Sequence, residues 1–125
     1  KPHAPVLFAN GGSAAARSAE NVFSARVSAG SHGLAVWVDA DQHDDEEEAH
    51  RVLSSLASQH ENVAARRLKG SAISEIVKAA EDEQAALLII GKRGTTPIVE
   101  LLIGSVAEGV ARESRQPVLL VPTNG

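Results

Sequence analysis

The chain has 125 residues, 43% of them hydrophobic and 22% charged, which suits one globular domain with its own core and argues against a disordered segment. Sixteen acidic against twelve basic residues give a net charge of −4, which excludes a broad basic face for duplex DNA. One Trp and two Phe are too few for the stacking platforms that bind single-stranded nucleic acid, and the absence of cysteine excludes disulfides, Cys-ligated zinc and thiol nucleophiles.

The longest apolar run, Ala85–Ile90, is far shorter than the roughly 20 residues of a membrane-spanning helix. The chain begins at Lys1, contains no methionine and shows no signal peptide. We therefore expect residues 1–125 to form one cytoplasmic domain that is a piece of a longer polypeptide.

Five short apolar runs alternate with four helical patterns. The runs predict strands over residues 5–9, 34–38, 63–68, 85–90 and 117–121. Helices are predicted to begin near residues 13, 44, 70 and 105, and in the second and third the apolar residues recur at i, i+3, i+4 and i+7. Three serines that follow glycine at these starts are candidate N-caps: Ser13, Ser71 and Ser105.

Strands that alternate with helices in this way indicate a parallel sheet with helices on both faces. The third run is alternating and polar, as an edge strand is, whereas the fourth is continuously apolar and should be buried on both faces. In such sheets ligands bind in a crevice at the carboxyl ends of the strands where the strand order reverses, here after the first and fourth strands. Glycines gather at these two points, at Gly11–Gly12 and at Gly91 and Gly94.

The segment Gly91–Ser105 reads G-x2-G-x9-G-S and runs from a strand end to a helix start. Gly91 and Gly94 let the backbone approach a phosphate closely and turn its N–H groups toward an anion. Gly104–Ser105 lies where the fourth helix presents its free N–H groups and the positive end of its dipole. The alternative is a purely structural loop in which the glycines only cap and the apolar side chains only pack.

This segment resembles the nucleotide-binding signature of the universal stress protein family, and the strand–loop–helix setting makes the match specific. Ser105–Arg112 and Pro117–Pro122 are similar to the closing helix and strand of that family, and Gly12–Ser13 and Gly70 also fit its pattern. The resemblance implies a doubly wound α/β domain of the adenine nucleotide alpha hydrolase-like type, with strand order 3-2-1-4-5. It further implies binding of ATP or AMP. If the acidic segment Asp39–Glu48 lies near the phosphates, Mg²⁺ could bridge the two groups of negative charge.

Carried over by position, the family's nucleotide contacts fall on the ends of the first, second and fourth strands and on the loop. The base would lie against Ala9, Asn10 and Val38, and Gly11 stands where the family commonly has an Asp that contacts the nucleotide. The phosphates and ribose would be held by Gly91, Arg93, Gly94, Gly104, Ser105 and Val106. A second departure is Ala86, where the family often has Asp.

Two other groups of polar residues have less specific patterns. Seven carboxylates between Asp39 and Glu48 lack the spacing of an EF-hand, so we interpret them as a solvated loop whose charges favour the start of a helix. The histidines lack metal-ligand spacing and are expected to be exposed to solvent, namely His3, His32, His43, His50 and His60. No metal site is predicted.

The last strand, within Pro117–Pro122, is apolar although it should lie at a sheet edge. Pairing with the same strand of a second copy would cover it and give a homodimer, as the resemblance also implies. The alternative is burial under the fourth helix and the tail.

These patterns together favour a regulatory module that senses an adenine nucleotide in a stress response. The loop offers Glu100 as its one acid and holds no histidine, so no general base is positioned for hydrolysis, and an enzyme is not predicted, although slow ATP turnover is compatible. The alternative is a nucleotide-free interaction domain, such as the regulatory part of a membrane transporter. Nucleic acid is not expected as a partner.

Overall fold

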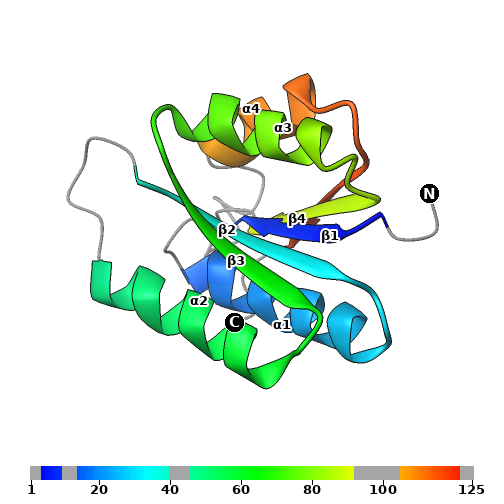
Figure 1. The fold of residues 1–125 in the computed structure, drawn as a ribbon. Helices are drawn as coiled ribbons and strands as arrows, with labels where there is room; N and C mark the ends of the chain where they lie inside the picture. The colour runs from blue at the N-terminus through cyan, green and yellow to red at the C-terminus, as the bar shows by residue number, and fades with distance from the viewer. Residues whose placement is uncertain (1–3, 10–13, 40–45, 92–104, 122–125) are drawn as a thin grey trace, which may run out of the picture.

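The computed structural model describes residues 4–9, 14–39, 46–91 and 105–121. Within these ranges, five strands alternate with four helices, as Figure 1 shows. In chain order these are β1 (Val6–Ala9), α1 (Ala14–Ser28), β2 (Gly33–Asp39), α2 (Glu46–Gln59), β3 (Val63–Lys69), α3 (Ala72–Asp82), β4 (Leu87–Gly91), α4 (Ser105–Glu113) and β5 (Val118–Val121).

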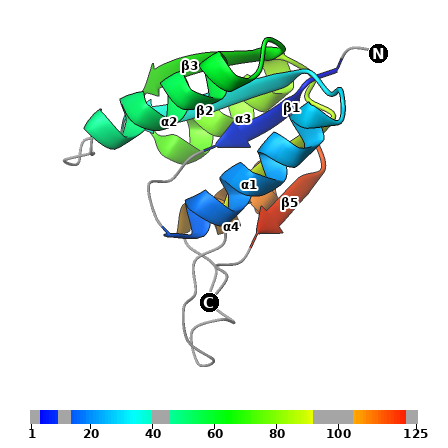
Figure 2. The same cartoon turned by 90° about the horizontal axis from the view of Figure 1, so that it is seen from below.

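The strands form one parallel sheet of order β3-β2-β1-β4-β5, which confirms the predicted doubly wound α/β fold. Helices α3 and α4 cover one face, and α1 and α2 cover the other (Figures 1 and 2). The chain passes from β1 to β2 and from β2 to β3 through α1 and α2, and it then moves in the opposite direction across the sheet through α3 and α4. Because the crossovers are right-handed, the two directions place the helices on opposite faces.

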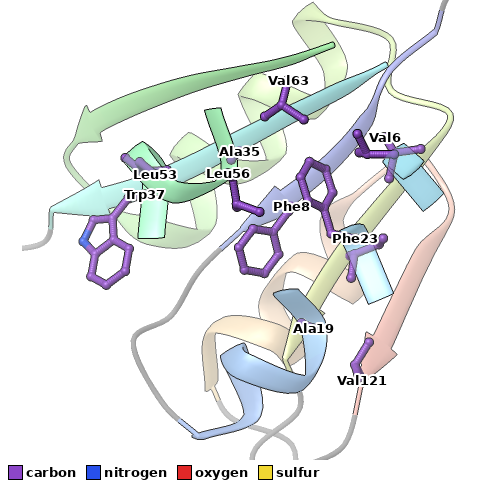
Figure 3. Packing of buried hydrophobic residues seen from close by; sticks show 12 residues of the cluster. Val6, Phe8, Ala19, Phe23, Ala35, Trp37, Leu53, Leu56, Val63 and Val121 are labelled. Atoms are coloured by element: carbon purple, nitrogen blue, oxygen red, sulfur yellow. The ribbon is translucent and has the colours of Figure 1, made fainter. Parts of the chain in front are cut away.

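The face under α1 and α2 is packed around two phenylalanines. Phe8 of β1 and Phe23 of α1 stack with ring centroids 5.4 Å apart, between Leu56 of α2 and Val121 of β5 (Figure 3). Because successive strand residues point to opposite faces, the neighbours of Phe8 in β1 belong to the other cluster. Burial of side chains this large makes this face a main source of stability.

The face under α3 and α4 is filled by smaller side chains. Leu7, Val36 and Leu88 of the sheet meet Ala79 and Ala80 of α3 and Val110 of α4, all buried. Alanines on the inner side of α3 let this helix lie close to the sheet, in accordance with a sequence that has few aromatic residues.

The amino ends of the strands are joined by short turns with internal hydrogen bonds. Asn62, which precedes β3, donates from Nδ2 to the carbonyl oxygens of Val27 (3.2 Å) and Ser31 (2.6 Å). Its own carbonyl accepts a hydrogen bond from the N–H of Gly33 at 2.9 Å. This one residue therefore ties the end of α1 to the starts of β2 and β3, and no sequence pattern pointed to it.

Two local predictions need correction. The strand predicted from Ala85 begins at Leu87. Ala86 is exposed and lies just before the strand, with its N–H donating to the carbonyl of Pro5 at 2.8 Å, and burial on both faces holds from Leu88 to Ile90. Ser71 occupies the N-cap position of α3 with extended backbone, but its hydroxyl makes no capping hydrogen bond.

The two edges of the sheet differ in chemistry. At one edge β3 is polar and largely exposed, as predicted. At the other edge, Val118 and Leu120 of β5 pack against the cluster under α3 and α4, while Leu119 remains 37% exposed. Helices α3 and α4 thus cover one side of β5. The alternative that the fourth helix and the tail bury the whole strand does not hold for Leu119.

Gly33, the first residue of β2, provides a test of the packing between α1 and the sheet. A Cβ atom at this position would lie 2.6 Å from Cζ of Phe23 and 2.8 Å from Cγ2 of Val27. Both side chains are buried, so we expect Gly33→Ala to lower the free energy of unfolding by about 1–3 kcal/mol, measured by urea denaturation. Adding Phe23→Leu, which removes the crowded ring atoms, should make the effect of Gly33→Ala smaller; an equal effect in both backgrounds would contradict this origin.

Candidate functional site

The order of the sheet reverses between β1 and β4. Ala9, the last residue of β1, lies in register with Val36 of β2 on one side and with Ile90 of β4 on the other. The connection after β1 leads to one face of the sheet and the connection after β4 to the other, so the carboxyl ends of these strands mark the position at which such folds bind ligands.

Helix α4 begins at this same end of the sheet. Its carboxyl end leads through Gln116 to Pro117, whose carbonyl accepts a hydrogen bond from the N–H of Leu88 at the start of β4 (2.9 Å). Because α4 therefore returns the chain to the amino end of β4, its first residue, Ser105, lies toward the carboxyl end. The free N–H groups and the positive end of the helix dipole accordingly point to the side where β1 and β4 end.

Half of the predicted nucleotide contacts lie in the described residues. Ala9 ends β1, Val38 is the second-last residue of β2, Gly91 ends β4, and Ser105 and Val106 open α4. The fold thus brings the ends of three strands and one helix start to one edge of the sheet. The other predicted contacts lie outside the described residues, namely Asn10, Gly11, Arg93, Gly94 and Gly104.

Burial decides which atoms of these residues a ligand can reach. Ala9 is 1% exposed and its side chain belongs to the cluster under α3 and α4, so almost none of its surface is open to a ligand in this structure. Val38 is half-buried on the same face, and lies in register with Leu68 of β3. Its partly exposed side chain can provide an apolar contact for a planar base.

The position of α4 is set by a close contact with α3. Ala107 and Val110 anchor the helix in the buried cluster. A Cβ atom on Gly109 would collide with Cδ1 of Ile73 and lie 2.9 Å from its Cγ1, so α4 can approach α3 this closely only with glycine there. Sequence reasoning missed this pair, although a glycine within a helical pattern is a signal of close packing.

Metal-ligating groups do not gather in the described part of the chain: no three His, Asp or Glu side chains there could share an ion. The acidic segment Asp39–Glu48 lies largely outside the described residues, and α2 begins within it at Glu46.

His32 is exposed as predicted, but the prediction was wrong for His60, which is half-buried and whose Nε2 atom is inaccessible to solvent. His60 differs because its turn between α2 and β3 is compact, its carbonyl accepting from the N–H of Val63.

In the ranges that the structure describes, none of the helices has the length and apolar character needed to cross a bilayer.

Comparison with known families gives a match between residues 7–122 and the universal stress protein family. Among curated proteins, the chain is 38% identical over 79 residues to the universal stress protein MJ0577 of Methanocaldococcus jannaschii, covering 60% of this chain and 49% of that protein. The chain spans about half the length of the curated relatives it matches.

Solved structures agree along the whole chain. The structure of MJ0577 superimposes with a TM-score of 0.71 at 26% identity and 98% coverage of both chains. A universal stress protein in complex with cAMP (TM-score 0.73, 21% identity, 98% of both chains) and one from Archaeoglobus fulgidus in complex with dAMP (0.69, 18%, 94% and 97%) share the fold.

The contact between Gly109 and Ile73 can be tested with Gly109→Ala, whose effect on the free energy of unfolding should change sign when Ile73 is shortened. In the interior of a helix, alanine stabilises the folded state by about 1 kcal/mol relative to glycine. Crowding of the new Cβ atom against Ile73 costs about 1–3 kcal/mol, so Gly109→Ala should destabilise the wild-type chain. In an Ile73→Ala background, where the crowded atoms are absent, the same substitution should stabilise. Urea denaturation of the four chains measures both effects, and destabilisation in both backgrounds would rule out this contact as the cause.

Proposed function

We propose that this chain, which belongs to the universal stress protein family, is a regulatory domain that binds ATP or AMP at the carboxyl ends of β1 and β4. The observation that carries the proposal is that Gly91, at the end of β4, and Ser105, at the start of α4, both lie at the carboxyl ends of the strands. The segment that joins them has the glycine spacing of a phosphate loop.

The chemistry of this edge suits a polyphosphate. The amino end of α4 supplies N–H donors and a positive dipole end, and Lys92 and Arg93 supply positive charge in a chain whose net charge is −4. Gly91, Gly94 and Gly104 permit close approach of the backbone to phosphate oxygens. Mg²⁺ would reduce the repulsion between the phosphates and the acidic segment that follows β2.

The relatives support an adenine nucleotide as the ligand class. Two proteins of the same fold were solved with cAMP and with dAMP, which share the adenine ring and at least one phosphate. In this chain the base would lie beside Val38 and Asn10, where β1 ends after the buried Ala9, with Asn10 or the backbone at Gly11 in place of the family's Asp. Arg93, Ser105 and Val106 would hold the phosphates and ribose.

We infer a sensing role in the stress response, in a cytoplasmic domain, in preference to an enzymatic one. Glu100 is the one acid of the Gly91–Ser105 segment and the segment lacks histidine, so it offers a cradle without a general base. One observation favours a second candidate: Gly11 replaces the family's Asp, which would weaken binding and suits a nucleotide-free interaction domain, such as the regulatory part of a transporter.

The apolar edge of β5 supports a homodimer. Leu119 is exposed in the middle of this edge strand, and pairing with β5 of a second copy would remove both its side chain and the free backbone groups from water. Such a contact is two-fold and self-complementary, so one apolar strand serves both copies.

Calorimetric titration with ATP, AMP and ADP, with and without Mg²⁺, tests the nucleotide site. We expect saturable binding of at least one of these ligands, and a loss of affinity of about tenfold or more with Gly94→Val, because its side chain would occupy the space of a phosphate. Ala57→Val, on the exposed side of α2, is the matched control. Unchanged affinity in Gly94→Val would exclude the loop as the phosphate site, and the absence of any binding would favour the interaction domain.

Sedimentation velocity of Leu119→Asp tests the dimer. The substitution adds a charge to the exposed side chain of the edge without touching the buried cluster, so it should give monomers at concentrations where the wild-type chain is a dimer. Leu120 is unsuitable for this test because it packs against the buried cluster under α3 and α4, so a charge there would also affect folding. The control is Ala111→Asp, which adds the same charge on the exposed side of α4. A dimer of unchanged stability in Leu119→Asp would show that β5 is not the interface.

A further inference from the structure

We propose, on the basis of the nucleotide site inferred above, that the base of the nucleotide extends from Val38 of β2 onto Leu68 of β3. Leu68 is the second-last residue of its strand, as Val38 is of β2, and the two lie in register. Contact with both side chains would make Leu68 a determinant of purine specificity, on a strand that the predicted set of nucleotide contacts did not include.

At the carboxyl end of the sheet, β2 and β3 continue beyond β1. Within the described residues, the pairing of β1 with β2 ends at Ala9 and Val36, whereas the pairing of β2 with β3 continues two residues further, through Val38 and Leu68. At about 3.3 Å per residue, this places the Val38–Leu68 pair about 6–7 Å past the last residue of β1. The pair therefore lies at the rim where sheets of this kind bind ligands.

Val38 and Leu68 form an apolar surface on the face of the sheet under α3. Residues in register on parallel strands have their side chains on the same face, and both of these pack partly against the buried cluster under α3 and α4. Both residues are half-buried, so each has surface left for a ligand. Because neighbouring strands are about 4.8 Å apart, the two side chains lie side by side.

The basic residues of β3 do not cover this surface. Arg67 and Lys69, the neighbours of Leu68 in the chain, lie on the opposite face of the sheet by alternation. Arg66 shares the face of Leu68, but it pairs with Glu83, with Nη2 3.4 Å from Oε2. The surface of Val38 and Leu68 is thus suited to the flat apolar face of a base.

The order of the strands gives the direction in which the ligand extends. The phosphates are proposed to lie at Gly91 of β4 and Ser105 of α4, and the sheet continues from β4 through β1 and β2 to β3 at its edge (Figure 1). The base is the opposite end of the nucleotide and lies at Val38, so its six-membered ring extends toward β3. The two fused rings of a purine can cover both Val38 and Leu68, whereas the single ring of a pyrimidine can cover one of them.

Calorimetric titration of Leu68→Ala with ATP tests the role of this side chain. We expect the affinity for ATP to fall about fivefold, because part of the apolar contact with the base is lost. Leu68→Met restores an apolar side chain of similar size and should recover most of the affinity. The affinity for CTP, measured by competition with ATP, should change less than the affinity for ATP.

The matched control is Leu87→Ala. Leu87 is also a half-buried leucine, but it lies at the amino end of β4, away from the site, so this variant should bind ATP as the wild-type chain does. Urea denaturation of the variants shows that each is folded under the conditions of the titration.

Photolabelling locates the base without any substitution. The reagent 2-azido-ATP carries its reactive group on the six-membered ring of the base. After irradiation and cleavage behind Glu61 and Glu75, we expect label in the peptide of residues 62–75, which contains Leu68. An excess of ATP should prevent this labelling.

Three results would overturn the role of Leu68 and leave the nucleotide site intact. These are wild-type affinity for ATP in Leu68→Ala, equal weakening of ATP and CTP in that variant, and ATP-sensitive labelling confined to peptides other than 62–75. A wild-type chain without saturable ATP binding would instead overturn the proposed nucleotide site, and this inference with it.

Discussion

Side by side in the middle of the sheet, β1 and β4 bury both of their faces. Leu7 and Leu88 enter the cluster under α3 and α4, while Phe8 and Ile89 enter the cluster under α1 and α2, and all four are fully enclosed. This pairing holds the two halves of the fold together, because β1 carries β2 and β3 on one side and β4 carries β5 on the other. The connections after these two strands go to opposite faces, so the pairing that stabilises the domain also sets the position of its candidate site.

Most of the fold could be predicted from periodicity. Runs such as Val6–Ala9 and Leu88–Ile90 are too short for helices and too apolar for loops, and the helices between them carry one apolar stripe. The errors arose where a local signal was decided by a contact elsewhere in the chain. Ala86 is apolar but exposed, just before β4, and its N–H bonds to Pro5, just before β1. Ser71 has the right residue type for a cap but makes no such bond, and His60 is half-buried in a compact turn.

The site was partly predictable for a different reason. The ends of β1, β2 and β4 and the start of α4 converge because of topology, which alternating strands and helices reveal. The contact between Gly109 and Ile73, which fixes how close α4 lies to α3, involves residues 36 positions apart (109 minus 73) and depends on helix geometry that periodicity alone does not give. The proposal that the Gly91–Ser105 segment binds phosphate rests on the spacing of its glycines and on the resemblance to the universal stress protein family, and nucleotide titration tests it.

The turn held by Asn62 has a consequence for how such a domain can diversify. Its amide locks the amino ends of β2 and β3 to the end of α1, so substitutions there act on folding. The segments after β1, β2 and β4, residues 10–13, 40–45 and 92–104, start from the opposite rim. The Asn62 turn and the carboxyl ends of β1, β2 and β4 lie at opposite ends of the strands. Substitutions after the carboxyl ends can therefore change which ligand is bound while the hydrogen bonds at the amino ends continue to hold the fold.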